Sequence, residues 1–216
     1  MPPWALSLEL VLLFFVLPLA FRFSPVRIPA LPALWLVCAY ALWQLLRDSG
    51  FDRLRMWNFS FARVAESSFW LPFLMVTFFL WLGVRRLAPQ LEWSFARAHP
   101  AFWAVVMIAY PILSVYPQGL LYRAFFFQRY AVLFPERWTM ILASAIAFAF
   151  LHIIFRNTLA VALTFVGGIL FAWRYAETGS LAVSSLEHAL YGCWLFTVGL
   201  GGFFYHGTIA GSVLRK

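Results

Sequence analysis

Three apolar segments of the chain carry polar side chains that could take part in chemistry. Arg123 lies in the stretch SVYPQGLLYRAFFFQRY at 114–130, and His152 and His188 lie in two later apolar segments. A polar group inside a membrane segment is costly unless it has a partner, and such groups therefore usually mark a site. A neutral imidazole can accept a proton at pH 7. The pattern favours an interior site, built from three helices, that can carry out proton transfer.

The spacing of these residues supports one shared site. Each has a neighbour four positions away on the same helix face, in the pairs Gly119 and Arg123, Phe148 and His152, and His188 and Gly192. A lone interior histidine is more often structural than catalytic. Two histidines and an arginine on three separate helices favour a functional site, since each of them needs a partner in lipid.

The composition of the chain places these segments in a membrane. Of 216 residues, 64% are hydrophobic and 11% are charged, whereas about 25% of residues are charged in soluble domains. The net charge of +8 comes from cations spread over the loops, which is typical of membrane topology, so no nucleic-acid partner is expected. Cys38 and Cys193 lie in apolar segments, which argues against a disulfide framework or a thiolate metal site. The first apolar segment is expected to be a retained helix, because such segments recur to the end of the chain.

The expected fold is an all-α polytopic integral membrane helix bundle with about eight transmembrane helices. The spans are expected at 4–21, 31–46, 67–84, 101–116, 118–134, 137–154, 158–175 and 181–199. A helix break is expected at Pro117, because the residue before a proline avoids the helical conformation. The charged, aromatic stretch 47–66 is expected to lie at the membrane interface. We expect a single membrane domain, with helices and loops at 1–100, a motif core at 101–204 and a tail at 205–216.

The motif core resembles the CPBP family, which comprises CAAX prenyl proteases and bacteriocin-processing (Abi) proteins that act as intramembrane glutamic endopeptidases. The family motifs are Glu-Glu-x-x-x-Arg, Phe-x-x-x-His and His-x-x-x-Asn (or Asp). They align with QGLLYR at 118–123, which includes Tyr122, with FAFLH at 148–152, and with HALYG at 188–192. The order and spacing of the three motifs carry the resemblance. It implies a multi-pass protein of a bacterial cytoplasmic membrane.

The resemblance also implies catalytic roles, and the chain departs from them. In the family, the first glutamate and the second-motif histidine activate a water molecule, and the third-motif histidine and asparagine stabilise the oxyanion. Here Gln118 and Gly119 stand in place of the glutamates, and Gly192 stands in place of the asparagine. His152 and His188 are retained. A glutamine cannot accept the proton, and losing a positioned acid–base group costs about 10²–10⁴ in rate.

Glu187 is the acidic residue beside the predicted site. We expect it to be a buried partner of Arg123, with a relocated general base as the alternative. Adjacent helical residues point about 100° apart, so Glu187 and His188 cannot both face one centre. A zinc site formed by His152, His188 and Glu187 has suitable ligand types, and His206 is a possible further ligand. No His-Glu-x-x-His helix is present, however, and neither a metal nor another cofactor is expected.

Two functions remain open. The first is a catalytically impaired family member that binds a membrane protein, lipid or peptide as a structural or regulatory subunit. The alternative is an active intramembrane endopeptidase that cleaves a membrane-associated or prenylated peptide. The expected partners are therefore the lipid bilayer and a membrane protein or peptide. Gly167 and Gly168 are expected to allow close helix packing, and Gly207 and Gly211 could form a surface for a partner helix.

Overall fold

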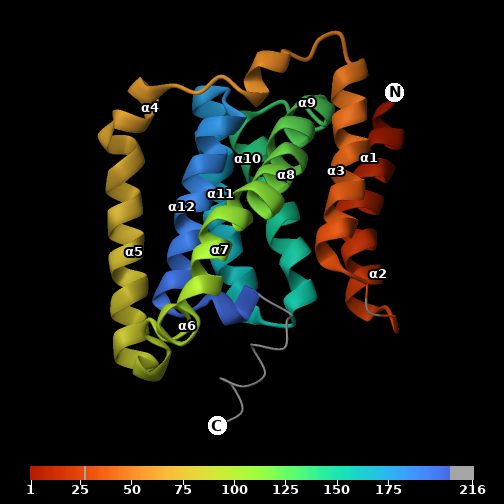
Figure 1. Ribbon diagram of the computed structural model, residues 1–216. Coiled ribbons are helices and arrows are strands. Elements are labelled where there is room, and N and C mark those ends of the chain that lie inside the picture. Colours follow the sequence, from red (N-terminus) through yellow and green to blue (C-terminus); the bar gives the residue numbers. More distant parts are fainter. Residues whose placement is uncertain (27, 205–216) are drawn as a thin grey trace.

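A computed structural model describes residues 1–26 and 28–204 of the chain (Figure 1). These residues form helices and connecting loops, without a strand among them. The α-helices (α) and the π- or 3₁₀-helical turns (η) are, in chain order, α1 (Pro3–Val11), η1 (Leu12–Val16), α2 (Leu17–Phe23), α3 (Ala30–Arg47), η2 (Arg53–Met56), α4 (Phe61–Ala65), α5 (Ser67–Leu87), η3 (Pro89–Leu91), α6 (Ser94–Ala98), α7 (Pro100–Tyr110), η4 (Pro111–Val115), α8 (Tyr116–Gly119), η5 (Leu120–Phe125), α9 (Phe126–Arg129), α10 (Arg137–Leu151), η6 (His152–Phe155), α11 (Thr158–Thr178), α12 (Leu181–Val198) and η7 (Gly201–Phe204).

Several of these elements join into helices that can cross a membrane. In the described part of the chain, six are long and apolar enough, namely Pro3–Phe23, Ala30–Arg47, Ser67–Leu87, Pro100–Arg129, Arg137–Phe155 and Thr158–Thr178. A helix of about 20 apolar residues spans the hydrocarbon core of a bilayer. The expected all-α polytopic membrane bundle is therefore confirmed. The chain is a multi-pass integral membrane protein.

The predicted break at Pro117 is wrong. The spans expected at 101–116 and 118–134 form one helix of 30 residues, Pro100–Arg129. Tyr116, just before the proline, is helical with φ −62° and ψ −48°. A proline ring clashes with the carbonyl four residues earlier, and for Pro117 that residue lies in the wider π-turn η4. Pro18 has the same arrangement with the π-turn η1, so π-turns allow both prolines to remain inside continuous helices.

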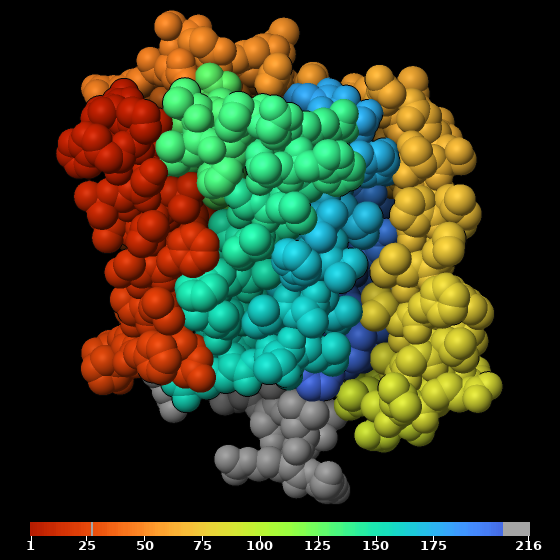
Figure 2. Space-filling view, turned by 180° about the vertical axis from the view of Figure 1, so that it is seen from behind, coloured from red at the N-terminus to blue at the C-terminus, as the bar shows by residue number. Residues whose placement is uncertain are grey.

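Helix α12 lies in the interior of the bundle and is packed against α5, α7, α8 and α11. Figure 1 shows it between α5 and the other two motif helices, α8 and α10, and the view from behind in Figure 2 shows residues of α10 and α11 covering that side of the bundle. Its buried face includes Ser184, Ser185, Glu187 and His188. Helix α12 thus runs beside the six spans although it is not among them, and it carries this polar content in the interior.

The segment between α3 and α5 crosses one end of the bundle (Figure 1). It contains the short elements η2 and α4, and the large apolar side chains of Leu54, Trp57 and Phe61 are exposed there. Amphipathic and aromatic side chains are favoured at the depth of the lipid headgroups. The position at the end of the spans agrees with the interfacial location expected for 47–66.

Helices α10 and α11 approach each other closely at Gly168. A Cβ atom at this position would lie 3.1 Å from the Cα atom of Ala145 on α10, a backbone atom that cannot move aside alone. Small residues allow this kind of close packing between membrane helices. The other predicted small-residue pair, Gly207 and Gly211, lies outside the described residues.

Substitution of Gly168 by valine should destabilise the fold by about 1–3 kcal/mol, because the added side chain overpacks the α10–α11 contact. Gly83 on α5 provides a matched control, since no atom lies within 4 Å of the Cβ position there. The measurement is the midpoint of thermal unfolding in a mild detergent. Equal shifts for the Gly168→Val and Gly83→Val variants would contradict the close contact.

Candidate functional site

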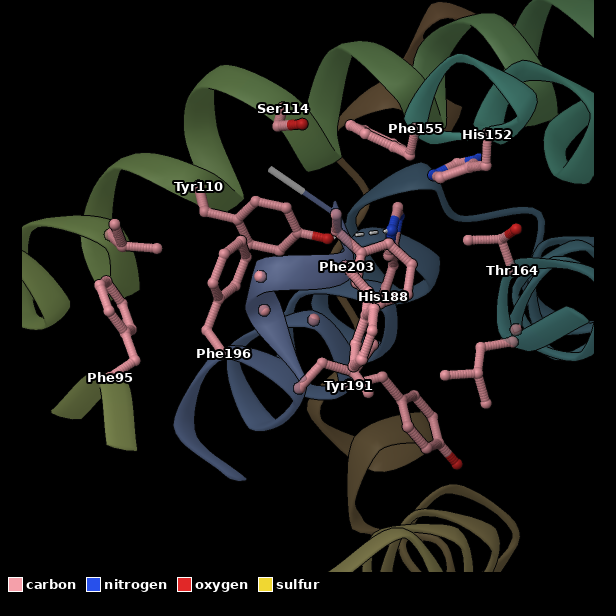
Figure 3. Close-up of a pocket in the computed structure, with 18 of the residues that line it drawn as sticks. Phe95, Tyr110, Ser114, His152, Phe155, Thr164, His188, Tyr191, Phe196 and Phe203 are labelled. Atoms are coloured by element: carbon pink, nitrogen blue, oxygen red, sulfur yellow. Dashed lines mark hydrogen bonds between the residues drawn. The ribbon is translucent and has the colours of Figure 1, made fainter. Parts of the chain in front are cut away.

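A cavity of about 520 Å³ lies where the three motif helices meet. Residues from all three motifs line it, among them Gln118 of α8, His152 at the start of η6 and His188 of α12. Gly192 also lines it, whereas Gly119 does not. Figure 3 shows the side chains of Tyr110, His152 and His188 converging on one region of this cavity. The fold thus brings together motif positions that are far apart in the sequence.

The two histidines are held in fixed orientations. The Nδ1 atom of His152 lies 2.8 Å from the carbonyl oxygen of Phe148, one turn earlier. A carbonyl can only accept a hydrogen bond, so Nδ1 carries the proton and Nε2 is the basic atom of the neutral ring. The His188 ring is stacked on Phe171 with centroids 4.5 Å apart, and its Nε2 atom lies 3.4 Å from the Tyr110 hydroxyl.

Gln118 is bound to its own helix. Its Nε2 atom donates a hydrogen bond of 2.8 Å to Ser114 Oγ. Its Oε1 atom is buried and has no hydrogen-bond partner within the described ranges. Gln118 lines the cavity, and it holds an amide at the position where the family motif has a carboxylate.

The two glycines of the motifs face hydroxyl groups from other elements. A Cβ atom at Gly119 would lie 2.7 Å from Ser185 Oγ and 3.0 Å from Leu181 Cδ1. A Cβ atom at Gly192 would collide with the ring and hydroxyl of Tyr110. At each position a hydroxyl from another helix occupies space that a larger motif side chain would need.

Arg123 is buried behind the wall of the cavity. Its side chain is 1% exposed, and its guanidinium carbon lies 4.5 Å from the ring centroid of Phe148 and 5.3 Å from that of Phe171. Both rings line the cavity, while Arg123 does not. No guanidinium nitrogen has a hydrogen-bond partner in the part of the chain that the structure describes. Cation–π contacts are worth about 2 kcal/mol when desolvated, so the rings offset part of the burial cost.

Glu187 is paired with Arg174 of α11, and the expectation that it partners Arg123 is wrong. Two hydrogen bonds join the pair, Arg174 Nε to Oε2 at 3.1 Å and Arg174 Nη2 to Oε1 at 3.2 Å. Both side chains are 2% exposed. Arg174 also donates to the backbone carbonyl of Ser68 on α5 at 2.6 Å. The carboxylate closest in sequence to His188 is thus held by a different arginine, away from the cavity.

Phe148 and Tyr122 connect the motif helices around the site. The Phe148 ring contacts Tyr122 edge-on, with centroids 5.3 Å apart, and also contacts the rings of both motif histidines. The backbone carbonyl of Tyr122 accepts a hydrogen bond of 2.6 Å from Ser144 of α10. These contacts fix η5 against α10.

The zinc set considered from the sequence does not assemble in the structure. Among residues 1–26 and 28–204 there is no group of three or more His, Cys, Asp or Glu side chains that could hold a metal ion. The Glu187 carboxylate is engaged by Arg174. The possible further ligand His206 lies outside the described residues.

Sequence reasoning missed three residues in and around the site. Arg174, Ser185 and Tyr110 belong to none of the three motifs. Each contacts a residue on another helix, namely Glu187, Gly119 and Gly192 in that order. A signal was available for Arg174 alone, because it is an arginine within an apolar span and such a residue requires a partner. The roles of Ser185 and Tyr110 follow only from packing against Gly119 and Gly192.

We predict that Glu187 is coupled more strongly to Arg174 than to Arg123. Substitution of Glu187 by glutamine should destabilise the protein by about 3–5 kcal/mol, because it leaves a buried arginine without its anion. The measurement is a pair of double-mutant cycles on unfolding in detergent, Glu187→Gln with Arg174→Gln and Glu187→Gln with Arg123→Gln. A larger coupling energy in the Arg123 cycle would contradict the pairing.

Comparison with known families identifies the motif region. Residues 100–194 match the family model described as Rce1-like, Type II CAAX prenyl endopeptidase Rce1-like. The matched region contains all three motifs, which confirms the resemblance to the CPBP and CAAX-protease family. Neither the comparison with curated proteins nor that with solved structures gives a match.

Proposed function

We propose that this CPBP-family membrane protein is catalytically impaired and acts as a binding subunit through its interior cavity. The observation that carries the proposal is the chemistry of the cavity wall. No Asp or Glu among the described residues lines the cavity. The motif position of the general base holds Gln118, and the neighbouring acid Glu187 is bound to Arg174. The site therefore lacks a carboxylate that could take a proton from water.

The retained cavity supports a binding role. Its volume of about 520 Å³ lies within the range of about 300–1,000 Å³ that is usual for ligand pockets. Its wall is mainly aromatic and aliphatic, with a few polar groups gathered around Tyr110, His152 and His188 (Figure 3). An apolar pocket with convergent polar groups is the usual form of a ligand site. A membrane-embedded lipid or peptide fits this character.

The alternative, an active endopeptidase, is favoured by one feature. His152 is oriented by the Phe148 carbonyl so that Nε2 is its basic atom, and this atom could act as a base without a carboxylate. Loss of a positioned acid–base group costs about 10²–10⁴ in rate, so such an enzyme would be slow.

The two functions predict different results in a cleavage assay with a quenched fluorescent membrane peptide. The chain as it stands should release no more product than its His152→Ala variant. The Gln118→Glu variant should gain turnover of about 10²-fold or more, because it restores a carboxylate at a position that lines the cavity. Gln118 is the position to restore, since a side chain at Gly119 would collide with Ser185.

The double variant Gln118→Glu/His152→Ala is the control, and it should lose the gained activity. Robust turnover by the unmodified chain that disappears on substitution of His152 would contradict the proposal that the protein is catalytically impaired. It would support the endopeptidase instead.

A further inference from the structure

We propose that the cavity binds a single-chain lipid with a carboxylate headgroup, such as a long-chain fatty acid. This inference rests on the proposed role of the cavity as a binding site. It adds the chemical class of the ligand, and it follows from the buried charges, the polar end of the cavity and the apolar wall that continues from it.

The buried charge of the bundle is unbalanced. In the described part of the chain, the charged side chains in the buried class are two arginines and one glutamate. Glu187 neutralises Arg174 through two hydrogen bonds, and Arg123 is left with three guanidinium nitrogens that have no acceptor among those residues. An arginine keeps its charge in proteins. One uncompensated positive charge therefore lies in the interior, where an anion would lower its free energy.

This charge lies next to the polar end of the cavity. Arg123 stacks against Phe148 and Phe171, and these rings form the cavity wall beside His152 and His188. An anion in the cavity would face the guanidinium across one layer of aromatic ring. Coulombic attraction is strong over such a distance in a medium of low dielectric constant. Direct contact with Arg123 is therefore not required for selectivity towards a negative headgroup.

The polar end also offers hydrogen-bond donors. The Tyr110 hydroxyl and His188 Nε2 share one hydrogen bond, and both residues line the cavity. If Tyr110 donates in that bond, the neutral ring keeps an Nδ1–H that has no partner among the described residues; if His188 donates, the Tyr110 O–H is free. Gln118 lines it as well, and its amide has two N–H groups, one of which donates to Ser114. An ionised carboxylate only accepts hydrogen bonds and can accept several. A carboxylate thus matches both the donors and the nearby charge, whereas an ester or alcohol matches neither as well.

The remainder of the wall fits an apolar chain. It is formed by aliphatic and aromatic side chains of α5, α7, α11, α12 and η7, including Val76, Val106, Leu163, Phe196 and Phe203. Figure 3 shows Phe95 and Phe196 on the side of the cavity away from His152. A volume of about 520 Å³ lies in the range of pockets for drug-sized ligands, which corresponds to one acyl chain and not to a two-chain phospholipid.

Competition binding tests the headgroup directly on the full chain in nanodiscs of phosphatidylcholine. The probe is tritiated oleate, and the competitors are unlabelled oleate, methyl oleate and oleyl alcohol. Oleate should compete about 10- to 100-fold better than the neutral analogues, because hydrogen bonds and attraction to a charged group contribute more than those to a neutral one. Specific binding is the part of the bound oleate that is lost when a bulky side chain fills the cavity.

Two tryptophan variants of α7 define this specific binding. Ala109 lines the cavity and Ala104 does not. Ala109→Trp should remove specific binding, and Ala104→Trp, the matched control on an exposed face of the same helix, should retain it. In a further pair, Arg123→Gln should reduce the preference for oleate over methyl oleate to about threefold or less, since the charge is gone, while Arg85→Gln at the end of α5 should leave it unchanged.

The inference is overturned if oleate and methyl oleate compete equally. It is also overturned if the Ala109→Trp variant binds as much oleate as the unmodified chain. Both comparisons use chains whose Arg123 is intact, so they stand even if the Arg123 variant does not fold. Stronger competition by a peptide with a free carboxyl terminus would overturn the assignment to a lipid. A positive peptidase assay would instead contradict the proposed function, so the two failures are distinguishable.

Discussion

A charge inside a membrane helix bundle has to be neutralised or shielded by the protein itself, because no bulk water reaches it. The chain meets this requirement at Arg174 with the Glu187 carboxylate and the Ser68 carbonyl. The pair links α11, α12 and α5. It also determines the chemistry of the site, since a carboxylate committed to Arg174 is not free to act beside His188. Glu187 could either neutralise a buried arginine or act in the site, and in the structure it neutralises Arg174.

The site differs from the family motifs in the same way at two positions. Where the motifs have large polar side chains, this chain has Gly119 and Gly192, and hydroxyls of Ser185 and Tyr110 occupy the adjacent space. A hydroxyl can donate or accept a hydrogen bond, but it cannot serve as a general base near neutral pH as a carboxylate can. The space at both positions is therefore filled, and the site remains partly polar. In the proposed function, the missing group is the carboxylate that would activate water.

Much of the fold could be predicted from the sequence, because composition and apolar run length are local properties. The spacing of four residues also predicted that Phe148 and His152 lie on one helix face, and their rings are in contact, with centroids 4.8 Å apart. The continuous helix at Pro117 could not be predicted, because the steric preference of the preceding residue is overcome by a π-turn in η4. The partner of Glu187 depends on how α11 packs against α12. No sequence motif indicates how these two helices pack.

The two motif histidines favour an active endopeptidase, and the missing carboxylate favours a catalytically impaired protein. A single-turnover experiment distinguishes these two functions. The purified chain, in molar excess over a membrane peptide, is incubated in water labelled with ¹⁸O, and the peptide products are analysed by mass spectrometry. This design detects hydrolysis that is too slow for repeated turnover. We predict no ¹⁸O in a new carboxyl terminus above the level of the His152→Ala variant. Labelled product in amounts that approach those of the protein, and that disappear with His152, would contradict it.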